Sequence, residues 1–154
     1  MQQRTAQDLA QAMRDGCLGV RIGRLHRVVA RRFDQALRPL GLTLPQLEVL
    51  GVLMLRGPLK PTAVADALEV ERSTISRNLA LMQQRGWIAL DPAPSGRAAS
   101  ATITKQGIEI LAQAKTAWAQ AQAYVVGGLG SETPATIDKW LDALAAADPP
   151  VTSA

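Results

Sequence analysis

Residues 72–84 read RSTISRNLALMQQ, and this stretch decides the fold. Ile75, Leu79 and Met82 follow the three- or four-residue spacing that places side chains on one face of a helix. The remaining positions of the first two turns are hydroxyl-bearing, amide or basic, and Gly86 follows as a helix stop. The sequence therefore predicts an amphipathic helix with a polar, cationic outer edge that contains no acidic residue.

Two shorter helices are predicted upstream of this segment. Thr43 and Gln46 have the spacing of a capping box, which predicts a helix over residues 44–55. Pro61 suits the first turn of a second helix, and residues 68–71 (LEVE) then form a tight turn. The order so far is helix, helix, tight turn, helix.

Downstream, the hydrophobic pattern changes from the helical period to the strand period. Residues 87–90 form a short apolar run, and residues 91–96 (DPAPSG) are rich in proline and glycine, as loops are. Small or apolar residues then alternate with Ser100 and Thr102 over residues 99–103. A β-hairpin directly after the helix pair completes the order of a winged helix-turn-helix.

This arrangement points to double-stranded DNA, because a single helix fits the major groove of B-DNA. Arg77 could contact guanine through two hydrogen bonds, and Asn78 could pair with adenine. Arg97, beside the hairpin loop, could enter a minor groove. The candidate DNA-binding residues are Arg72, Ser73, Thr74, Ser76, Arg77, Asn78 and Arg97.

A long helix is predicted before the helix pair, over residues 18–40, with apolar positions that step by three or four. A shorter helix precedes it and is expected to begin at Thr5, which has capping-box spacing to Asp8. The opposite face of the long helix is rich in arginine. Three readings of that face stay open: a solvated surface paired with Asp34 or with acids of a partner chain, a DNA contact, or a site for a ligand carboxylate.

After the hairpin, Thr104 caps a helix predicted over residues 105–129, and a last helix follows over residues 134–147. The first of these would be about 36 Å long, roughly twice the common helix length. A long apolar stripe on a small chain needs a second chain to cover it. Residues 148–154 are expected to be a flexible tail.

Composition fits a mainly helical, folded protein with a small β-hairpin. The chain has 154 residues, 47% hydrophobic and 19% charged, and a formal net charge of +4. Residues 1–40 hold eight arginines and three aspartates, whereas residues 105–154 hold three lysines and five acidic residues. Phosphate groups are therefore expected to meet the N-terminal two thirds of the chain.

The inventory of reactive side chains argues against an enzyme. One histidine, one cysteine and scattered acids cannot assemble a catalytic triad, a metal cluster or a phosphate loop, so neither a cofactor nor a metal is expected. The longest strongly apolar run, residues 49–55, is too short to span a bilayer, and no signal peptide is recognised. A soluble cytoplasmic protein is the expectation.

Taken together, the motifs resemble the MarR family of bacterial transcriptional regulators over about residues 18–145. The resemblance rests on their order and spacing, in the segments LGLT (40–43), Gln46, Leu50, Ala65, Leu68, Val70, RSTISRNL (72–79), RGWI (85–88), Asp91-Pro92, Gly96-Arg97 and ITKQG (103–107).

The resemblance implies a winged helix-turn-helix domain over residues 41–104, and a dimerisation region formed by residues 1–40 and 105–147. It implies a homodimer on a pseudo-palindromic operator, usually a repressor that releases DNA when a small phenolic or anionic ligand binds between the lobes. The residues assigned to dimerisation are Leu18, Leu25, Leu111, Trp118, Val125, Trp140 and Leu144. Family wings often carry an aspartate and two adjacent arginines, whereas this chain has Arg97 alone.

Other functions stay open beside this one. Cys17 could make the chain a thiol-based redox sensor on the same fold, although that chemistry needs a stabilised thiolate. His26, the only histidine, is a candidate ligand-binding residue. Finally, some winged helices bind proteins instead of DNA, and the polar, acid-free edge of residues 72–78 argues against that reading.

Overall fold

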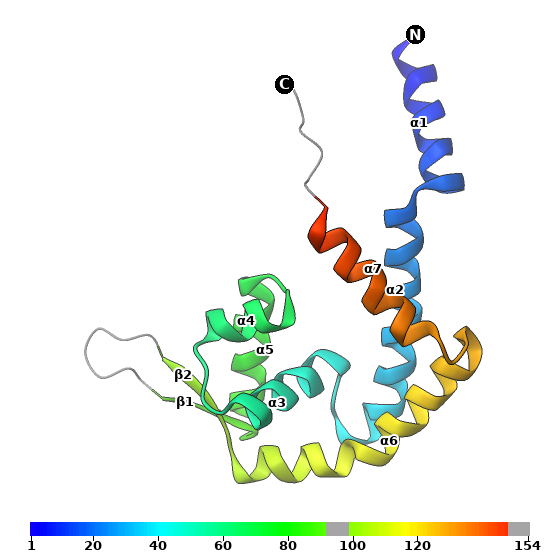
Figure 1. Cartoon of the computed structure of the whole chain (residues 1–154). Helices are drawn as coiled ribbons and strands as arrows, with labels where there is room; N and C mark the ends of the chain where they lie inside the picture. The colour runs from blue at the N-terminus through cyan, green and yellow to red at the C-terminus, as the bar shows by residue number, and fades with distance from the viewer. Residues whose placement is uncertain (92–98, 148–154) are drawn as a thin grey trace.

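A computed structural model describes residues 1–91 and 99–147 (Figure 1). The chain is mainly helical with one two-stranded antiparallel sheet, as the sequence predicts. Its elements are α1 (Gln2–Gly16), α2 (Leu18–Leu37), the 3₁₀ helix η1 (Arg38–Leu40), α3 (Leu44–Arg56), α4 (Pro61–Leu68), α5 (Arg72–Gln84), β1 (Ile88–Asp91), β2 (Ser100–Ile103), α6 (Lys105–Leu129) and α7 (Thr133–Ala146).

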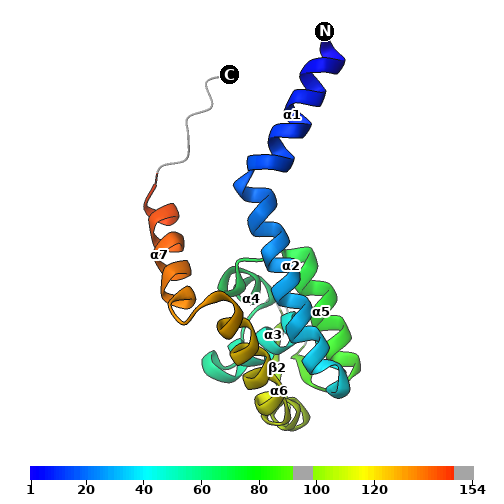
Figure 2. The same ribbon diagram turned by 90° about the vertical axis from the view of Figure 1, so that its right-hand side faces the viewer.

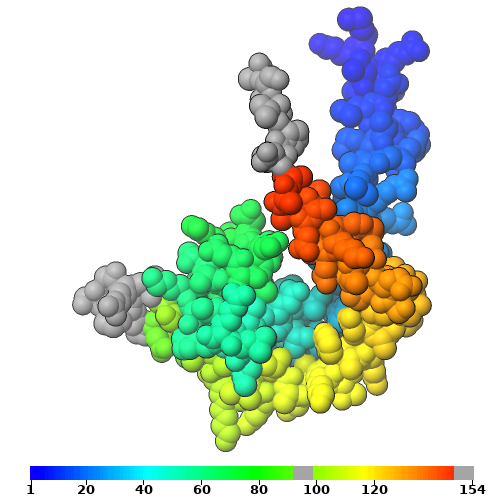
Figure 3. All heavy atoms as spheres, in the orientation of Figure 1, coloured from blue at the N-terminus to red at the C-terminus, as the bar shows by residue number. Residues whose placement is uncertain are grey.

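Helices α3, α4 and α5 and the hairpin form one lobe, and α6 runs from this lobe toward α7 (Figure 1). Helix α2 packs against α6, and α1 continues beyond the end of α2 with no buried residue of its own. In Figure 3 the α3–α5 lobe and α7 stand apart as two masses, with α6 beneath them.

The hydrophobic core is continuous from the lobe into the junction of α2 with α6. Aliphatic side chains fill it almost alone, as the low aromatic content of the sequence requires. Its largest fully buried members are Leu37, Val49, Leu50, Leu53, Val64, Ile75, Leu79, Met82 and Ile88.

Several local signals are confirmed by the structure. The reciprocal capping box between Thr43 and Gln46 is present at the start of α3. Thr104 caps α6, and its hydroxyl accepts a hydrogen bond of 3.0 Å from the backbone N–H of Gly107. Gly41 ends η1 in the left-handed conformation, with φ of 69°.

Two helix boundaries differ from the expectation, and two further expectations are not tested by the structure. The first helix begins at Gln2 instead of Thr5, whose hydroxyl donates to the carbonyl of Met1 within the first turn. The second helix keeps α-helical geometry only to Leu37, because the residues before Gly41 tighten into η1. The expected tail at residues 148–154 and the loop that holds Arg97 lie outside the described residues.

Candidate nucleic-acid interface

Helix α5 has one buried face and one exposed face. Ile75, Leu79 and Met82 are buried and fix the helix against the rest of the lobe, where its neighbours are α3, α4 and β1. Ser73 and Arg77 lie one turn apart on the opposite side and are exposed. The predicted orientation of α5 is therefore confirmed.

The exposed edge contains most of the sequence-predicted residues. Asn78 differs from the others, because it is half-buried at the border of the buried face. The Ser76 hydroxyl donates to the carbonyl of Arg72 at 3.0 Å, so it can offer an outside partner only its acceptor lone pairs. The exposed members are Arg72, Ser73, Thr74, Ser76 and Arg77.

The first turn of α5 has no side-chain cap. Glu71 is the N-cap residue, and its carboxylate makes no capping hydrogen bond. This is expected, because the shorter side chain of aspartate caps a helix better than that of glutamate. The first N–H groups of a helix have no intrahelical partner, and they attract anions when no side chain satisfies them. The start of α5 can therefore accept a phosphate oxygen beside Ser73.

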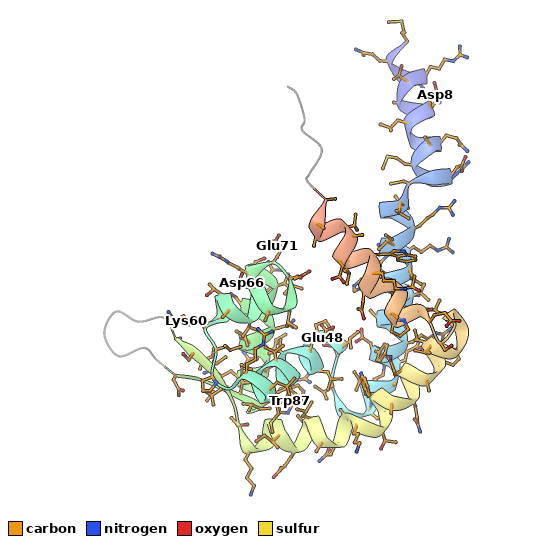
Figure 4. All side chains as sticks on the ribbon, in the orientation of Figure 1. Asp8, Glu48, Lys60, Asp66, Glu71 and Trp87 are labelled. Carbon is orange, nitrogen blue, oxygen red and sulfur yellow. The ribbon has the colours of Figure 1, made fainter. Side chains whose placement is uncertain are left out.

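The tertiary structure adds acidic residues that the sequence of α5 alone does not contain. Asp66 and Glu69, from the end of α4 and the turn, line a small pocket together with Glu71 and Arg72. Figure 4 shows Asp66 and Glu71 at the same edge of the lobe. These acids share the pocket with Arg72, whereas Arg77 does not line it, so Arg77 is the more favourable of the two arginines for an anion.

The end of α5 is locked to the neighbouring elements by Arg85. Its guanidinium lies 4.8 Å from the centre of the Trp87 ring and donates to the carbonyl of Gly41. The turn itself requires glycine, since Gly86 has φ of 71°. These contacts fix where α5 stops and the hairpin begins.

The hairpin pairs Ile88 with Ile103 and Asp91 with Ser100 in an antiparallel register. Leu59 adds a third, single-residue bridge to Ala101, with N···O distances of 3.1 and 2.8 Å. The sequence pattern did not predict this bridge, which places the exposed Lys60 beside the loop end of the hairpin strands (Figure 4). Lys60 is therefore a further candidate for contact with phosphate.

A cleft of about 410 Å³ lies between α3 and α6. Apolar side chains dominate its lining, with Glu48 and Lys115 as its charged residues and Trp118 as its aromatic one. Partial burial raises the pKa of Glu48, and the nearby His26 opposes that rise. Figure 4 shows Glu48 on the side of α3 that faces α2. The cleft can hold a small molecule with an aromatic ring and an anionic group.

His26 and Cys17, both at α2, lie apart from the exposed edge of α5. His26 lines a second, apolar cavity of about 530 Å³ between α2, α6 and α7. Cys17 is half-buried at the junction of α1 and α2, and its redox role stays a prediction. No group of three potential metal ligands exists among the described residues, and no helix there is long and apolar enough to cross a membrane.

The helix pair, its tight turn and the hairpin define a winged helix-turn-helix protein. Residues 40–98 match the model of the MarR family. An uncharacterized HTH-type transcriptional regulator of Bacillus subtilis (strain 168), YwoH, is 28% identical over 80 residues, which are 52% of this chain and 58% of that protein. The chain thus aligns with less than two thirds of the length of that relative.

Solved structures agree over a larger part of the chain. The M. tuberculosis transcriptional regulator MosR matches with a TM-score of 0.76 and 28% identity, covering 86% of this chain and 98% of MosR. MosR in complex with DNA matches with a TM-score of 0.73 and 29% identity, covering 84% and 97%. Residues 40–98 thus match the MarR family, as the motifs indicate, and the chain has the fold of solved transcriptional regulators such as MosR.

Proposed function

We propose that the chain is a homodimeric, sequence-specific DNA-binding repressor that releases its operator when a small phenolic or anionic ligand binds. The observation that carries this proposal is the exposed edge of α5, which presents Ser73 and Arg77 opposite a fully buried face. A solved relative of the same fold is a complex with DNA. The chain has one histidine, one cysteine and scattered acidic residues, and this set of reactive side chains supports a regulatory role in place of a catalytic one.

The proposed contacts divide into two kinds. Arg77 would read a base in the major groove, because its guanidinium can donate two parallel hydrogen bonds to guanine. Ser73, the free amides at the start of α5 and Lys60 would contact phosphates, which position the protein without reading sequence. Arg97 remains a candidate for the minor groove.

Exposed apolar side chains support the dimer. Trp118, Trp140 and Leu144 are 43%, 60% and 71% exposed. Monomeric proteins rarely expose large apolar side chains together in extended patches. Leu18 and Leu25 are exposed as well, whereas Leu111 and Val125 are half-buried against the core. A second copy would cover these helices and would place two α5 helices on one operator.

The cleft between α3 and α6 supports the ligand response. It joins the winged lobe to the helices proposed for dimerisation, so a ligand seated there could change the distance between the two α5 helices of a dimer. Lys115 would attract an anionic group and Trp118 would pack against a ring. A ligand can shift the protein away from DNA only by binding the released form more tightly.

The test begins with selection of bound duplexes from a random pool, which yields the operator. Arg77→Ala should then lower operator affinity by about 1–3 kcal/mol and relax the base preference at one position of each half-site. Arg77→Lys should keep binding to random duplex while losing that preference, since lysine keeps the charge but not the fork of donors. Arg4→Ala removes the same charge from α1 and should leave base preference unchanged.

Unaltered operator affinity and base preference in Arg77→Ala would refute the role given to α5. Failure of the wild-type chain to bind any duplex at low salt would refute the proposed function as a whole and favour a protein-interaction module.

A further inference from the structure

The outward face of α2 carries a row of arginines that the proposed contact with the operator does not use. Arg24, Arg27 and Arg31 follow a spacing of three and four residues, so they lie on one side of the helix. All three are exposed. We call these three residues the arginine stripe.

The stripe has no acidic counterpart in the structure. Asp34 is the only acid of α2, and its carboxylate accepts a hydrogen bond of 2.7 Å from the backbone N–H of Leu44. Among the described residues, no member of the stripe forms an ion pair or a hydrogen bond with another side chain. Like charges three and four residues apart repel and destabilise a helix, so the stripe is a cost to folding with no internal compensation.

The stripe also lies outside the surface that a second copy would cover. The apolar positions of α2, including Ile22, Leu25 and Val29, face the cavity shared with α6 and α7, on the opposite side of the helix. Figure 2 views the molecule from the side where α2 lies in front of the α3–α5 lobe, with no other helix over it. Dimerisation through the apolar side therefore leaves the stripe in solvent.

Nor can the duplex held by α5 of the same chain reach the stripe. Figure 1 shows α2 on the side of the molecule away from the hairpin, with α3 between α2 and the hairpin and α6 beneath them. A ligand for the stripe must therefore be a separate anion or polyanion.

We propose that the arginine stripe is a second, sequence-independent binding surface for double-stranded DNA, which holds the backbone of another duplex segment while α5 holds the operator. This inference goes beyond the proposed function, because it lets one protein molecule join two DNA segments.

The chemistry and the dimensions favour a phosphate backbone over a single small anion. Arginine presents a planar fork of donors that matches phosphate, and the stripe contains no lysine. From Arg24 to Arg31 the helix rises about 10 Å, a length over which a duplex carries roughly six phosphates. Three cations in a row along this length suit a polyanion, whereas one small anion would occupy only one of them.

The experiment compares the wild-type full-length chain with the triple variant R24Q/R27Q/R31Q. Glutamine keeps the helix propensity and removes the charge. The matched control, R4Q/R14Q/K139Q, removes three exposed cations outside α2. Circular dichroism and sedimentation check that both variants fold and keep the oligomeric state of the wild type.

Operator duplex is fixed on beads and saturated with protein, and a fluorescent duplex without an operator is added. The wild type and the control should capture the fluorescent duplex, and the triple variant should lose at least tenfold of that capture. Its operator affinity at 200 mM salt should stay within twofold of the wild type. The logarithmic salt slope of the capture should fall by about 2.7, since each lost phosphate contact contributes about 0.9. The single variant Arg27→Gln should lower the slope by about 0.9.

Equal capture by the triple variant and the wild type would overturn the proposal, as would a wild type that holds operator but captures no second duplex. A triple variant that becomes monomeric would also overturn it, because the stripe would then belong to the interface between copies. If capture depends on the stripe while Arg77→Ala changes neither operator affinity nor base preference, the role given to α5 fails and the stripe stands.

Discussion

Gly107→Ala should destabilise the protein strongly, because Gly107 lies where α6 meets the start of the hairpin. A Cβ at this position would lie 2.0 Å from the carbonyl oxygen of Trp87 and 2.8 Å from Cγ1 of Ile103. Contacts between carbon and oxygen normally begin at about 3.3 Å, so the backbone at Gly107 or at Trp87 would have to move by more than about 1 Å. The same carbonyl accepts a hydrogen bond of 3.0 Å from the N–H of Thr104, and the movement would strain it.

The magnitude follows from these two effects. Overpacking in a core costs about 1–3 kcal/mol, and the weakened hydrogen bond adds about 1 kcal/mol. We expect a loss of about 3 kcal/mol in the free energy of unfolding, and a fall in Tm of roughly 6–12 °C for a chain of this size. Urea unfolding followed by circular dichroism measures the loss.

Gly51→Ala is the matched control. Gly51 lies inside α3, and a Cβ there would have no atom within 4 Å. Since alanine is the better helix former, this variant should be about 0.5–1 kcal/mol more stable than the wild type. A loss below about 1 kcal/mol for Gly107→Ala, or equal effects of the two substitutions, would refute the close packing of α6 on the Trp87 carbonyl.

Two further variants test the cleft and the dimer. Burial raises the pKa of Glu48, so the carboxyl group of Glu48 holds its proton more tightly in the folded chain than in the unfolded chain. The protonated side chain therefore contributes stability at low pH, and this stability is lost as the pH rises through the folded pKa. Glu48→Gln should therefore raise Tm at pH 7 relative to the wild type and have little effect at about pH 4; a lower Tm at pH 7 would contradict the assignment. Trp140→Glu places a charge on the exposed apolar face of α7 and should shift the sedimentation coefficient toward the monomer at micromolar concentration, whereas the exposed polar substitution Lys139→Gln should not. A wild type that sediments as a monomer would remove the dimer from the proposal.

The sequence alone determined the elements whose signals are local. The capping box at Thr43, the cap at Thr104 and the buried positions Ile75, Leu79 and Met82 all follow from contacts within one helix or its first turn. Such contacts depend on backbone geometry that a few neighbouring residues fix. The order of these elements was therefore sufficient to predict the winged helix-turn-helix.

Only the tertiary structure decided which side of an amphipathic segment is covered and which distant groups meet. Helical spacing puts Trp118 on the same stripe as Ala114, yet the chain buries Ala114 and leaves Trp118 43% exposed where it lines the cleft between α3 and α6. The pocket that Asp66 and Glu69 share with Arg72 and the bridge between Leu59 and Ala101 both join residues from different elements. No periodicity within a segment contains such information, because these contacts exist only when the helices have packed against each other.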